Sequence, residues 1–228
     1  MRFAIDVPYA EKDEAKGMGA RWDPAGKTWY VGQSDHPARQ HWPSPLAEFP
    51  GEDRSFGGSM LFVDLVPRSC WFTNARSALS PSDWQRVRNL AGGRTGWACE
   101  TCGAKGTCHI HERWAFLRET QTQSLRRLIA LCANCHLATH FGFAEISGKR
   151  DVAARQLASI NHWSMDQVDE HVDRAFGLWR RRNEIDWKLD LGILTDAGLT
   201  IIKPAPVASR AEMAAAALES VRDDSLSL

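Results

Sequence analysis

The sequence has no run of about eighteen consecutive apolar residues, which is the least that a membrane-spanning helix needs. It also lacks the apolar core of a secretory signal, because the N-terminal stretch MRFAIDVPYAEKDEA soon becomes acidic and polar. No internal repeat is visible. We therefore expect a cytoplasmic globular protein, whose 228 residues allow one sizeable domain and a small second one.

The chain also has no net charge, since 28 basic residues balance 28 acidic ones. That balance hides a local excess: residues 66–150 carry twelve basic and five acidic side chains, together with four of the eight histidines. A basic patch of this kind suits a polyanion, because neutralising phosphates drives much of nucleic-acid binding. The alternative is a solvated surface on which the charges cluster by chance.

Disulfides are not expected in a cytoplasm that keeps thiols reduced, so the cysteine pattern indicates metal binding. Four of the six cysteines form two C-x-x-C pairs, Cys99 with Cys102 and Cys132 with Cys135. Each two-residue spacer lets both thiolates face one ion, and four thiolates close a tetrahedron with no position left for a substrate. The sequence therefore predicts a structural zinc site on these four cysteines.

Two histidines follow the second pair directly, and they remain free once the cysteines are used. His136 and His140 lie in CHLATHFG, which reads as a short helix ending at glycine, and histidines four apart share one helical face. In the expected strand CHIHERW, His109 and His111 share one face, and Glu112 points to the other unless a bulge re-aims it. The imidazoles can therefore converge on a second site beside the zinc.

The first 32 residues read as a small αβ module with two alternating strands, a short polar helix and a D-P-x-G turn. The stretch VPYAEKDEAKGMGARWDPAGKTWYV resembles a small module of unknown function attached to plasmid primases and other DNA-processing proteins. The resemblance implies a link to mobile elements or phage, through nucleic-acid contact or as a folding or docking appendage. Residues 33–59 hold four prolines and are expected to be a linker or a surface loop.

Further elements are expected on both sides of the cysteine region. Residues 60–66, MLFVDLV, should form a buried strand, and a helix should begin after Ser80. Ser164 and Gln167 form a capping box for an amphipathic helix whose apolar stripe should face the core. That stripe consists of Val168, Val172, Ala175, Phe176 and Trp179. Residues 199–228 should form a linker, a terminal helix and a fraying tail.

The stretches CETCG, CHIHERW and LIALCANCHLATH, which lie within residues 99–142, resemble an HNH endonuclease of the ββα-metal type. PRSCWFTNARSALSPSDW before them, and NHWS and WKLDLG after them, resemble a bacterial branch of that family. The resemblance implies an α+β fold, with a zinc-stapled ββα-metal core flanked by helices over residues 60–198. It also implies a catalytic cation on His136, with His111 as the general base. His140 could supply a further ligand that the family pattern does not require.

Two positions depart from the family pattern. Ile110 stands where the family usually has Asp or His before its base. An alternative register therefore makes His111 a metal ligand and Glu112 the base. Arg127 replaces the middle Asn that normally orients the base, and it could instead hold the scissile phosphate beside Arg126.

These features predict a metal-dependent HNH-type endonuclease that hydrolyses phosphodiester bonds in DNA, with Mg²⁺ or another divalent cation at the catalytic site. One alternative is a non-catalytic, zinc-stabilised module that binds nucleic acid on the same scaffold. Another is a protein-binding regulator in which the zinc domain only holds shape, with the N-terminal module and surfaces rich in the ten tryptophans as docking sites. A homodimer is also possible. A disulfide oxidoreductase does not fit, because the C-x-x-C pairs lie outside a thioredoxin-like βαβ pattern.

Overall fold

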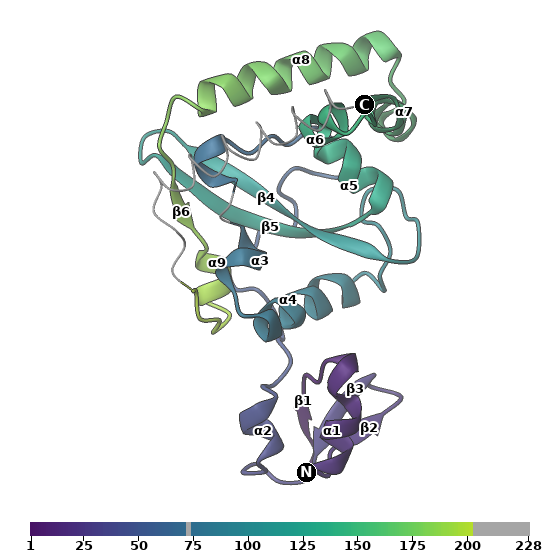
Figure 1. Ribbon diagram of the computed structural model, residues 1–228, viewed down its shortest axis with the longest axis vertical. Coiled ribbons are helices and arrows are strands. Elements are labelled where there is room, and N and C mark those ends of the chain that lie inside the picture. The colour runs from purple at the N-terminus through teal and green to yellow at the C-terminus, as the bar shows by residue number, and fades with distance from the viewer. Residues whose placement is uncertain (72–73, 203–228) are drawn as a thin grey trace, which may run out of the picture.

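The computed structural model describes residues 1–71 and 74–202. It shows a small N-terminal module beside a larger body in which helices cover both faces of a long β-hairpin (Figure 1). Helices and sheets are mixed along the chain, so the expected α+β class is confirmed. Within the described ranges, none of the helices has the length and apolar character needed to cross a bilayer.

The N-terminal module is a three-stranded antiparallel sheet in the order β1-β3-β2, with helices packed against it. Its elements are β1 (Phe3–Ile5), η1 (Tyr9–Glu11), α1 (Lys12–Gly17), β2 (Arg21–Asp23), β3 (Thr28–Val31) and α2 (Ala38–His41). Ile5, Trp29 and Val31 point from the sheet into one small buried cluster.

This module extends beyond the expected boundary at residue 32. Trp42 is buried in the same cluster as Ile5 and Trp29, and its Nε1 donates to Glu11 Oε2 at 2.7 Å. The start of the segment 33–59, read from its prolines as a linker, therefore belongs to the module. Proline content indicated an irregular backbone there, but it did not reveal that a tryptophan closes the core.

The module contacts the larger body through helix α4 (Pro81–Gly93). The Asn89 side chain donates to Asp6 Oδ1 at 2.7 Å, and the guanidinium of Arg86 donates twice to the Ser44 carbonyl, at 2.8 and 3.1 Å. One face of α4 is thus tied to the N-terminal residues.

The larger body is organised around an antiparallel hairpin of β4 (Cys108–Leu117) and β5 (Thr122–Cys132). The short strand β6 (Lys188–Asp190) adds to β5 in parallel, so β4 remains at the edge of this sheet. Helix α5 (Ala133–Thr139) begins at the residue after β5. The chain therefore runs strand, strand, helix with no connecting loop before the helix.

The register of the hairpin fixes where the side chains of β4 point. His111 pairs with Ile129 and Glu112 with Leu128, and the register shifts after Arg113. That irregularity lies past Glu112, so it does not re-aim this carboxylate, which stays on the face opposite His111.

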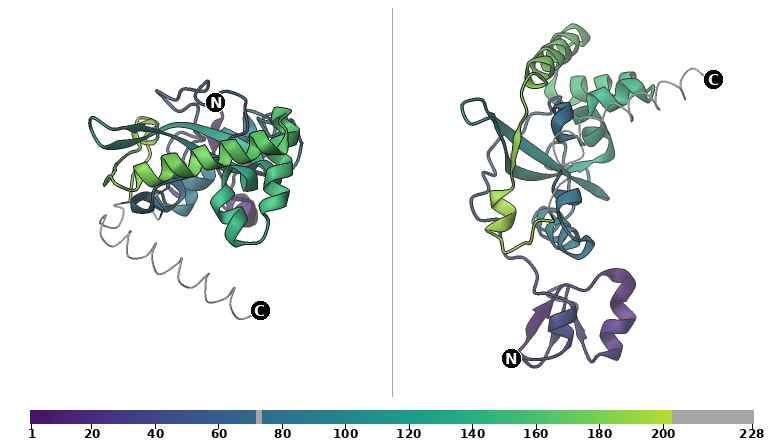
Figure 2. Two further views of the ribbon diagram at one scale, coloured as in Figure 1. Left: turned by 90° about the horizontal axis from the view of Figure 1, so that it is seen from above. Right: turned by 60° about the vertical axis from the view of Figure 1, so that its left-hand side comes forward.

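Different helices cover the two faces of the hairpin (Figures 1 and 2), and each face carries its own core. Ile110, Trp114 and Leu128 pack with α4 on one side, whereas Ile129 and Leu131 pack with the helices that follow β5. The remaining elements are η2 (Arg68–Cys70), α3 (Ala75–Ala78), α6 (Phe141–Ile146), α7 (Arg150–Asn161), α8 (Met165–Arg182) and α9 (Gly192–Thr195).

The strand expected over residues 60–66 is not formed. Leu61 and Val63 are buried as expected, but their backbones bond to helix side chains. Leu61 N–H donates to Asn161 Oδ1 at 3.1 Å, and Val63 N–H donates to His171 Nε2 at 3.0 Å. An apolar run indicates burial, but it does not reveal whether the partner is a strand.

The expected helix starts are confirmed where the structure describes them. Ser80 Oγ accepts from the Asp83 N–H ahead of α4, and Ser164 forms a reciprocal capping box with Gln167 ahead of α8. Val168 and Val172 of the predicted stripe are buried in the core. The helix and tail expected near the C-terminus fall on residues 203–228, outside the described residues.

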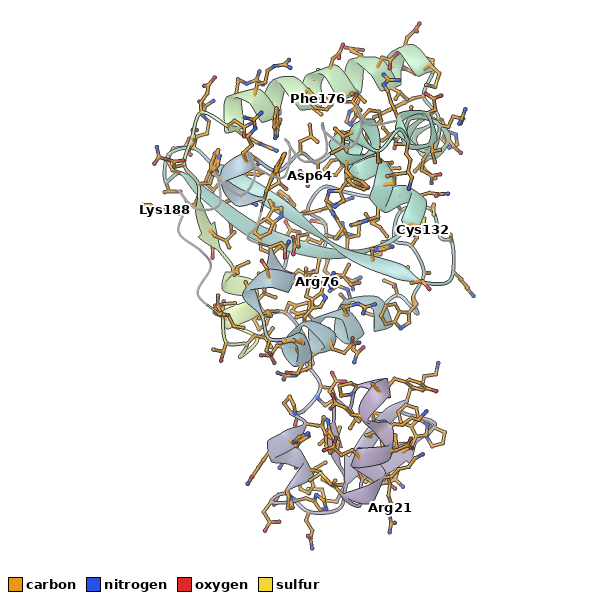
Figure 3. All side chains as sticks on the ribbon, in the orientation of Figure 1. Arg21, Asp64, Arg76, Cys132, Phe176 and Lys188 are labelled. Atoms are coloured by element: carbon orange, nitrogen blue, oxygen red, sulfur yellow. The ribbon has the colours of Figure 1, made fainter. Side chains whose placement is uncertain are left out.

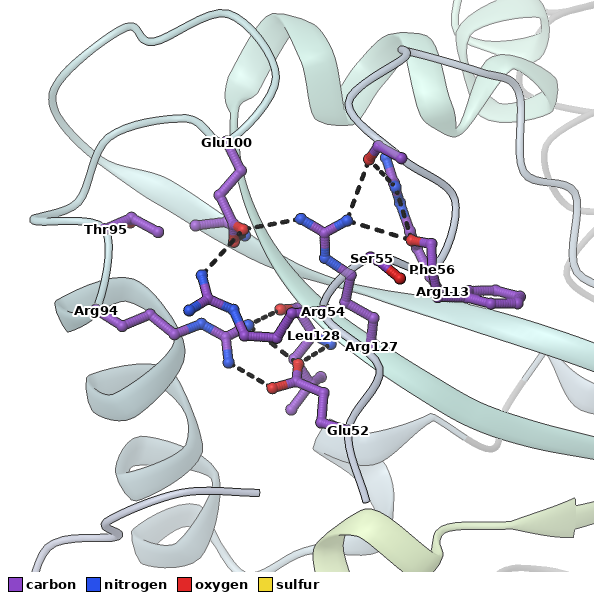
Figure 4. A network of polar contacts seen from close by, with 12 residues as sticks. Glu52, Arg54, Ser55, Phe56, Arg94, Thr95, Glu100, Arg113, Arg127 and Leu128 are labelled. Carbon is purple, nitrogen blue, oxygen red and sulfur yellow. Dashed lines mark hydrogen bonds and ion pairs between the residues drawn. The ribbon is translucent and has the colours of Figure 1, made fainter. Parts of the chain in front are cut away.

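A buried polar network fastens the irregular segment 43–67 to the hairpin (Figure 4). Arg127 donates to the carbonyls of Phe56 and Gly58 at 3.2 and 3.1 Å and to Glu100 Oε2 at 2.9 Å. Arg113 donates to the same two carbonyls at 3.1 and 2.8 Å. Only 8% of the Arg127 side chain is exposed, so the role expected from the sequence, holding a phosphate, does not fit its position.

Two further contacts extend this network. Gly57 adopts a φ of +75°, and a Cβ at this position would lie 2.6 Å from the Arg113 guanidinium, so the loop needs glycine here. Arg94, the residue after α4, donates to both carboxylate oxygens of Glu52 and to the Leu128 carbonyl, which ties the loop, the helix end and β5 together.

We predict that Arg127→Ala lowers the free energy of unfolding by about 3–5 kcal/mol, because Glu100 and two carbonyls lose a buried partner. Urea unfolding followed by circular dichroism measures the change. Arg118→Ala, in the exposed turn of the hairpin, is the control and should change stability by less than about 0.5 kcal/mol. An Arg127→Ala variant that is as stable as the parent but binds DNA poorly would restore the phosphate role.

Candidate metal centres and the adjoining cleft

Four cysteines meet at one end of the hairpin. Cys99 and Cys102 come from the turn before β4, Cys132 ends β5, and Cys135 lies in α5. Their sulfurs all lie within 4.8 Å of one another, and those of Cys102 and Cys132 are 3.7 Å apart. This group could hold a metal such as zinc, which four thiolates bind with closed tetrahedral coordination.

The backbone around Cys99 is built to hold a thiolate. Gly103 turns the chain with a φ of +75° and donates its N–H to the Cys99 carbonyl at 2.9 Å. A hydrogen bond from the Cys135 thiol, followed by backbone N–H groups that include those of Cys102 and Cys132, lowers the pKa of Cys99 to about 4. Since zinc binds thiolates rather than thiols, the backbone donors suit metal binding, whereas the Cys135 thiol would give up its proton to bind the ion.

Three histidines form a second group on the face of the hairpin covered by α5. His111 comes from β4, His136 from α5, and His140 follows the end of α5. One nitrogen of each lies within 4.8 Å of the other two, and the Nε2 atoms of His136 and His140 are 3.2 Å apart. Three convergent imidazoles could hold a divalent transition metal.

Burial favours the neutral form of two of these imidazoles, those of His136 and His140. It lowers the pKa of His136 to about 2 and that of His140 to about 3, with the neighbouring imidazoles adding to the effect in both cases. The neutral imidazole is the form that binds metal ions, so a cation would not have to displace protons from these two side chains.

Two further side chains adjoin the histidines. The ring of His109, which is exposed, stacks on His136 with centroids 4.7 Å apart and planes 6° apart. Asp64, from the apolar run MLFVDLV, places its Oδ2 3.8 Å from His111 Nε2. The sequence motifs do not single out Asp64. The signal available was a charged residue inside an apolar run, which is seldom buried without a partner.

A cleft of about 480 Å³ opens along the free edge of β4. One part of its lining comes from His109, His111, His136 and His140, and another from Asn74, Arg76, Trp84 and Arg88 of the α3–α4 region. Because β4 is an edge strand, the cleft reaches residues from both faces of the hairpin.

Glu112 belongs to this cleft but not to the histidine group. Its Oε1 accepts from the Ala75 N–H at 2.6 Å, at the start of α3. Burial raises the pKa of Glu112 to about 7, and the hydrogen bonds from the backbone of Ala75 and Arg76 oppose that rise without cancelling it. A carboxyl group with this pKa can exchange a proton near neutral pH.

The arginines of the cleft differ from those expected. Arg126 lies at the register shift of β5 and Arg127 in the buried network, and neither lines the cleft. Arg76 and Arg88 line it instead. Arg88 makes a long hydrogen bond to Gln85 at 3.5 Å, and neither Arg76 nor Arg88 pairs with a carboxylate of the described residues.

We predict that acidification destabilises the folded chain through His136 and His140. Their folded pKa values lie below the ordinary 6.5, so the unfolded chain takes up more protons and stability falls as the pH drops below 6.5. Each histidine should cost about 1 kcal/mol between pH 6.5 and 5.5. Urea unfolding of protein loaded with one zinc per chain measures this, and a His136→Gln/His140→Gln variant should show the shallower pH dependence. The prediction would be contradicted if the free energy of unfolding depended on pH equally in the parent and the variant.

Comparison with known proteins finds similarity for the N-terminal part of the chain. The family model described as Domain of unknown function (DUF5710) matches residues 2–42. The chain is 67% identical over 30 residues, 13% of its length, to an Escherichia coli protein named DNA primase TraC, and 49% identical over 37 residues, 16% of its length, to a second protein of that name. These matches cover 2% and 4% of those primases. No solved structure matches the chain.

Proposed function

We propose that this protein is a metal-dependent endonuclease of the HNH type that hydrolyses phosphodiester bonds in DNA. The observation that carries the proposal is the convergence of His111, His136 and His140 beside a separate group of four cysteines. One group has the chemistry of a closed structural site, whereas the other opens on a cleft that also contains arginine.

The two groups would divide their tasks. The cysteines would hold zinc and fasten the turn before β4 to the start of α5. His111, His136 and His140 would hold a second divalent cation, and their nitrogen donors favour a transition metal over Mg²⁺. When bound, such a cation would polarise a non-bridging phosphate oxygen and stabilise the leaving 3′-oxygen.

Of the two registers that the sequence leaves open, the geometry favours the one in which His111 is a ligand. One ring nitrogen of His111 lies within 4.8 Å of a ring nitrogen of His136 and of His140. Glu112 would then be the general base and take a proton from the attacking water. It lines the same cleft and has a pKa of about 7.

Arg76 and Arg88 would hold the DNA backbone in place of Arg126 and Arg127. Their guanidinium groups border the cleft and are not neutralised by carboxylates of the described residues. Guanidinium groups bind phosphate oxygens in bidentate fashion, but such contacts carry no base information. We therefore propose cleavage with little sequence preference.

A non-catalytic nucleic-acid-binding module on the same scaffold is the second candidate, supported by the similarity of the N-terminal segment to part of the TraC primases. It would use the same cleft without cleaving DNA. The docking alternative based on tryptophans has less support, because Trp22 alone among the ten tryptophans, all of them described, is exposed.

We predict that His136→Ala abolishes nicking of supercoiled plasmid in Mn²⁺, by at least about 100-fold, because a ligand of the reactive cation is lost. One zinc per chain should remain bound. Glu112→Gln should slow nicking to a similar degree while the second cation still binds, since this change removes the base only. Gel assays and metal analysis measure both effects.

His41→Ala, in the exposed part of the N-terminal module, is the control and should cut DNA like the parent. If the parent binds DNA but never cuts it with Mg²⁺, Mn²⁺ or Co²⁺, the non-catalytic module is the correct function. If His136→Ala cuts as fast as the parent, the histidine assignment is wrong.

We predict that Arg76→Gln/Arg88→Gln weakens DNA binding and lowers the slope of log K against log[salt] by about 0.9 for each lost phosphate contact. Fluorescence anisotropy with a labelled duplex measures both quantities. Arg155→Gln on the exposed face of α7 removes one positive charge away from the cleft and should leave the slope unchanged. Equal slopes for all variants would place the DNA elsewhere on the molecule.

A further inference from the structure

Asp64 is a buried carboxylate next to the histidine group, and the proposed function gives it no task. The whole residue is 7% exposed, and its backbone N–H donates to the Thr139 carbonyl at 3.0 Å, which fixes it beside α5. Figure 3 shows it between the hairpin and α8, whereas Arg76 lies on the other side of the hairpin. The residues next to Asp64 in the sequence do not predict this position, because Asp64 and Thr139 lie far apart in the chain.

The side chain of Asp64 faces two groups. Its Oδ2 lies 3.8 Å from His111 Nε2, and its Oδ1 lies 4.0 Å from the Arg182 guanidinium. The His111 side chain is 4% exposed, and its Nε2 is a buried polar atom without a hydrogen-bond partner. A buried imidazole N–H that is left unpaired costs the desolvation free energy of that group, so a hydrogen bond to the adjacent carboxylate would be favourable.

Among the three histidines, Asp64 lies within ion-pair distance of His111, and its charge also acts on His140. The group in which every donor lies within 4.8 Å of every other consists of His111, His136 and His140, and Asp64 is not part of it. A carboxylate beyond one ligating histidine is a recurrent arrangement in metal sites, where it accepts the distal N–H and leaves the other ring nitrogen free to bind the ion.

Charge gives a second reason for a carboxylate here. Three neutral imidazoles would leave both charges of a divalent cation uncompensated in a mostly buried site, which is costly. Arg182 adds a further positive charge nearby, and Glu112 points to the opposite face of β4. Asp64 is therefore the carboxylate placed to offset the cation from the side of His111.

We propose that Asp64 is a positioning residue that accepts the Nε2–H of His111 and so presents Nδ1 of that ring to the cation. The proposal rests on the proposed function, because it needs a cation at the three histidines. It assigns Asp64 a role in metal affinity and in ring orientation, and none in contacting DNA or the attacking water.

The test is titration of Co²⁺ into protein that already carries one zinc per chain, followed by visible absorption. Asp64→Asn should bind the second cation about 10–100-fold more weakly than the parent and give a shifted absorption band. Arg182→Gln is the matched control, because it removes the other partner of Asp64 and keeps the carboxylate. It should bind Co²⁺ within about threefold of the parent.

Two results would overturn the proposal. One is an Asp64→Asn variant with the parent's affinity and spectrum, and the other is an Arg182→Gln variant that loses as much affinity, which would make Asp64 a structural partner of Arg182. If the parent and His136→Ala bind no second cation at all, the proposed function fails together with this inference. Loss in His136→Ala but not in Asp64→Asn would leave the function standing and remove only the inference.

A measurement on the parent keeps the proposal testable if Asp64→Asn does not fold. Long-range ¹H–¹⁵N correlation spectra distinguish the two neutral tautomers of a histidine ring. His111 should carry its proton on Nε2 before the second cation is added. A proton on Nδ1 would contradict the proposal, because Asp64 would then face a bare nitrogen.

Discussion

The meeting of four sulfurs at the end of the hairpin is the constraint on which the rest of the larger body depends. Cys132 ends β5 and Cys135 lies in the first turn of α5, so an ion shared with Cys99 and Cys102 would fix the angle at which the helix leaves the strand. That angle determines where His136 and His140 point. A closed thiolate site can contribute roughly 10–16 kcal/mol of apparent binding free energy, enough to hold a short helix that would not be stable alone.

The second structural requirement is that the arginines buried beside the hairpin have hydrogen-bond partners. Arg127, Arg113 and Arg94 satisfy carbonyls of the loop and of β5, and Glu100 and Glu52 balance them. These bonds hold an irregular segment of the chain, which forms no β-ladder, against the sheet. The same segment places Asp64 beside the histidines, so the contacts that hold the loop also support the candidate metal centre.

Much of the local architecture could be predicted from the sequence, because it follows from short-range chemistry. Each of the predicted features depends on a few neighbouring residues. They are the helix caps Ser80 and Ser164, the spacing of the cysteines, and the pair His136 and His140. The contacts of Asp64, Trp42 and Arg127 could not be predicted in this way, since each joins segments remote in sequence. Positive charge marks Arg76, Arg88 and Arg127 alike, and only the fold separates a guanidinium that faces a cleft from one that holds a loop.

Helix α4 serves two neighbours at once. Trp84 and Arg88 border the cleft, while Asn89 and Arg86 hold the N-terminal module by hydrogen bonds to Asp6 and Ser44. These hydrogen bonds attach the N-terminal module to the larger body by more than the connecting chain. If the module and the cleft bind one partner, these hydrogen bonds would fix the distance between the two points of contact.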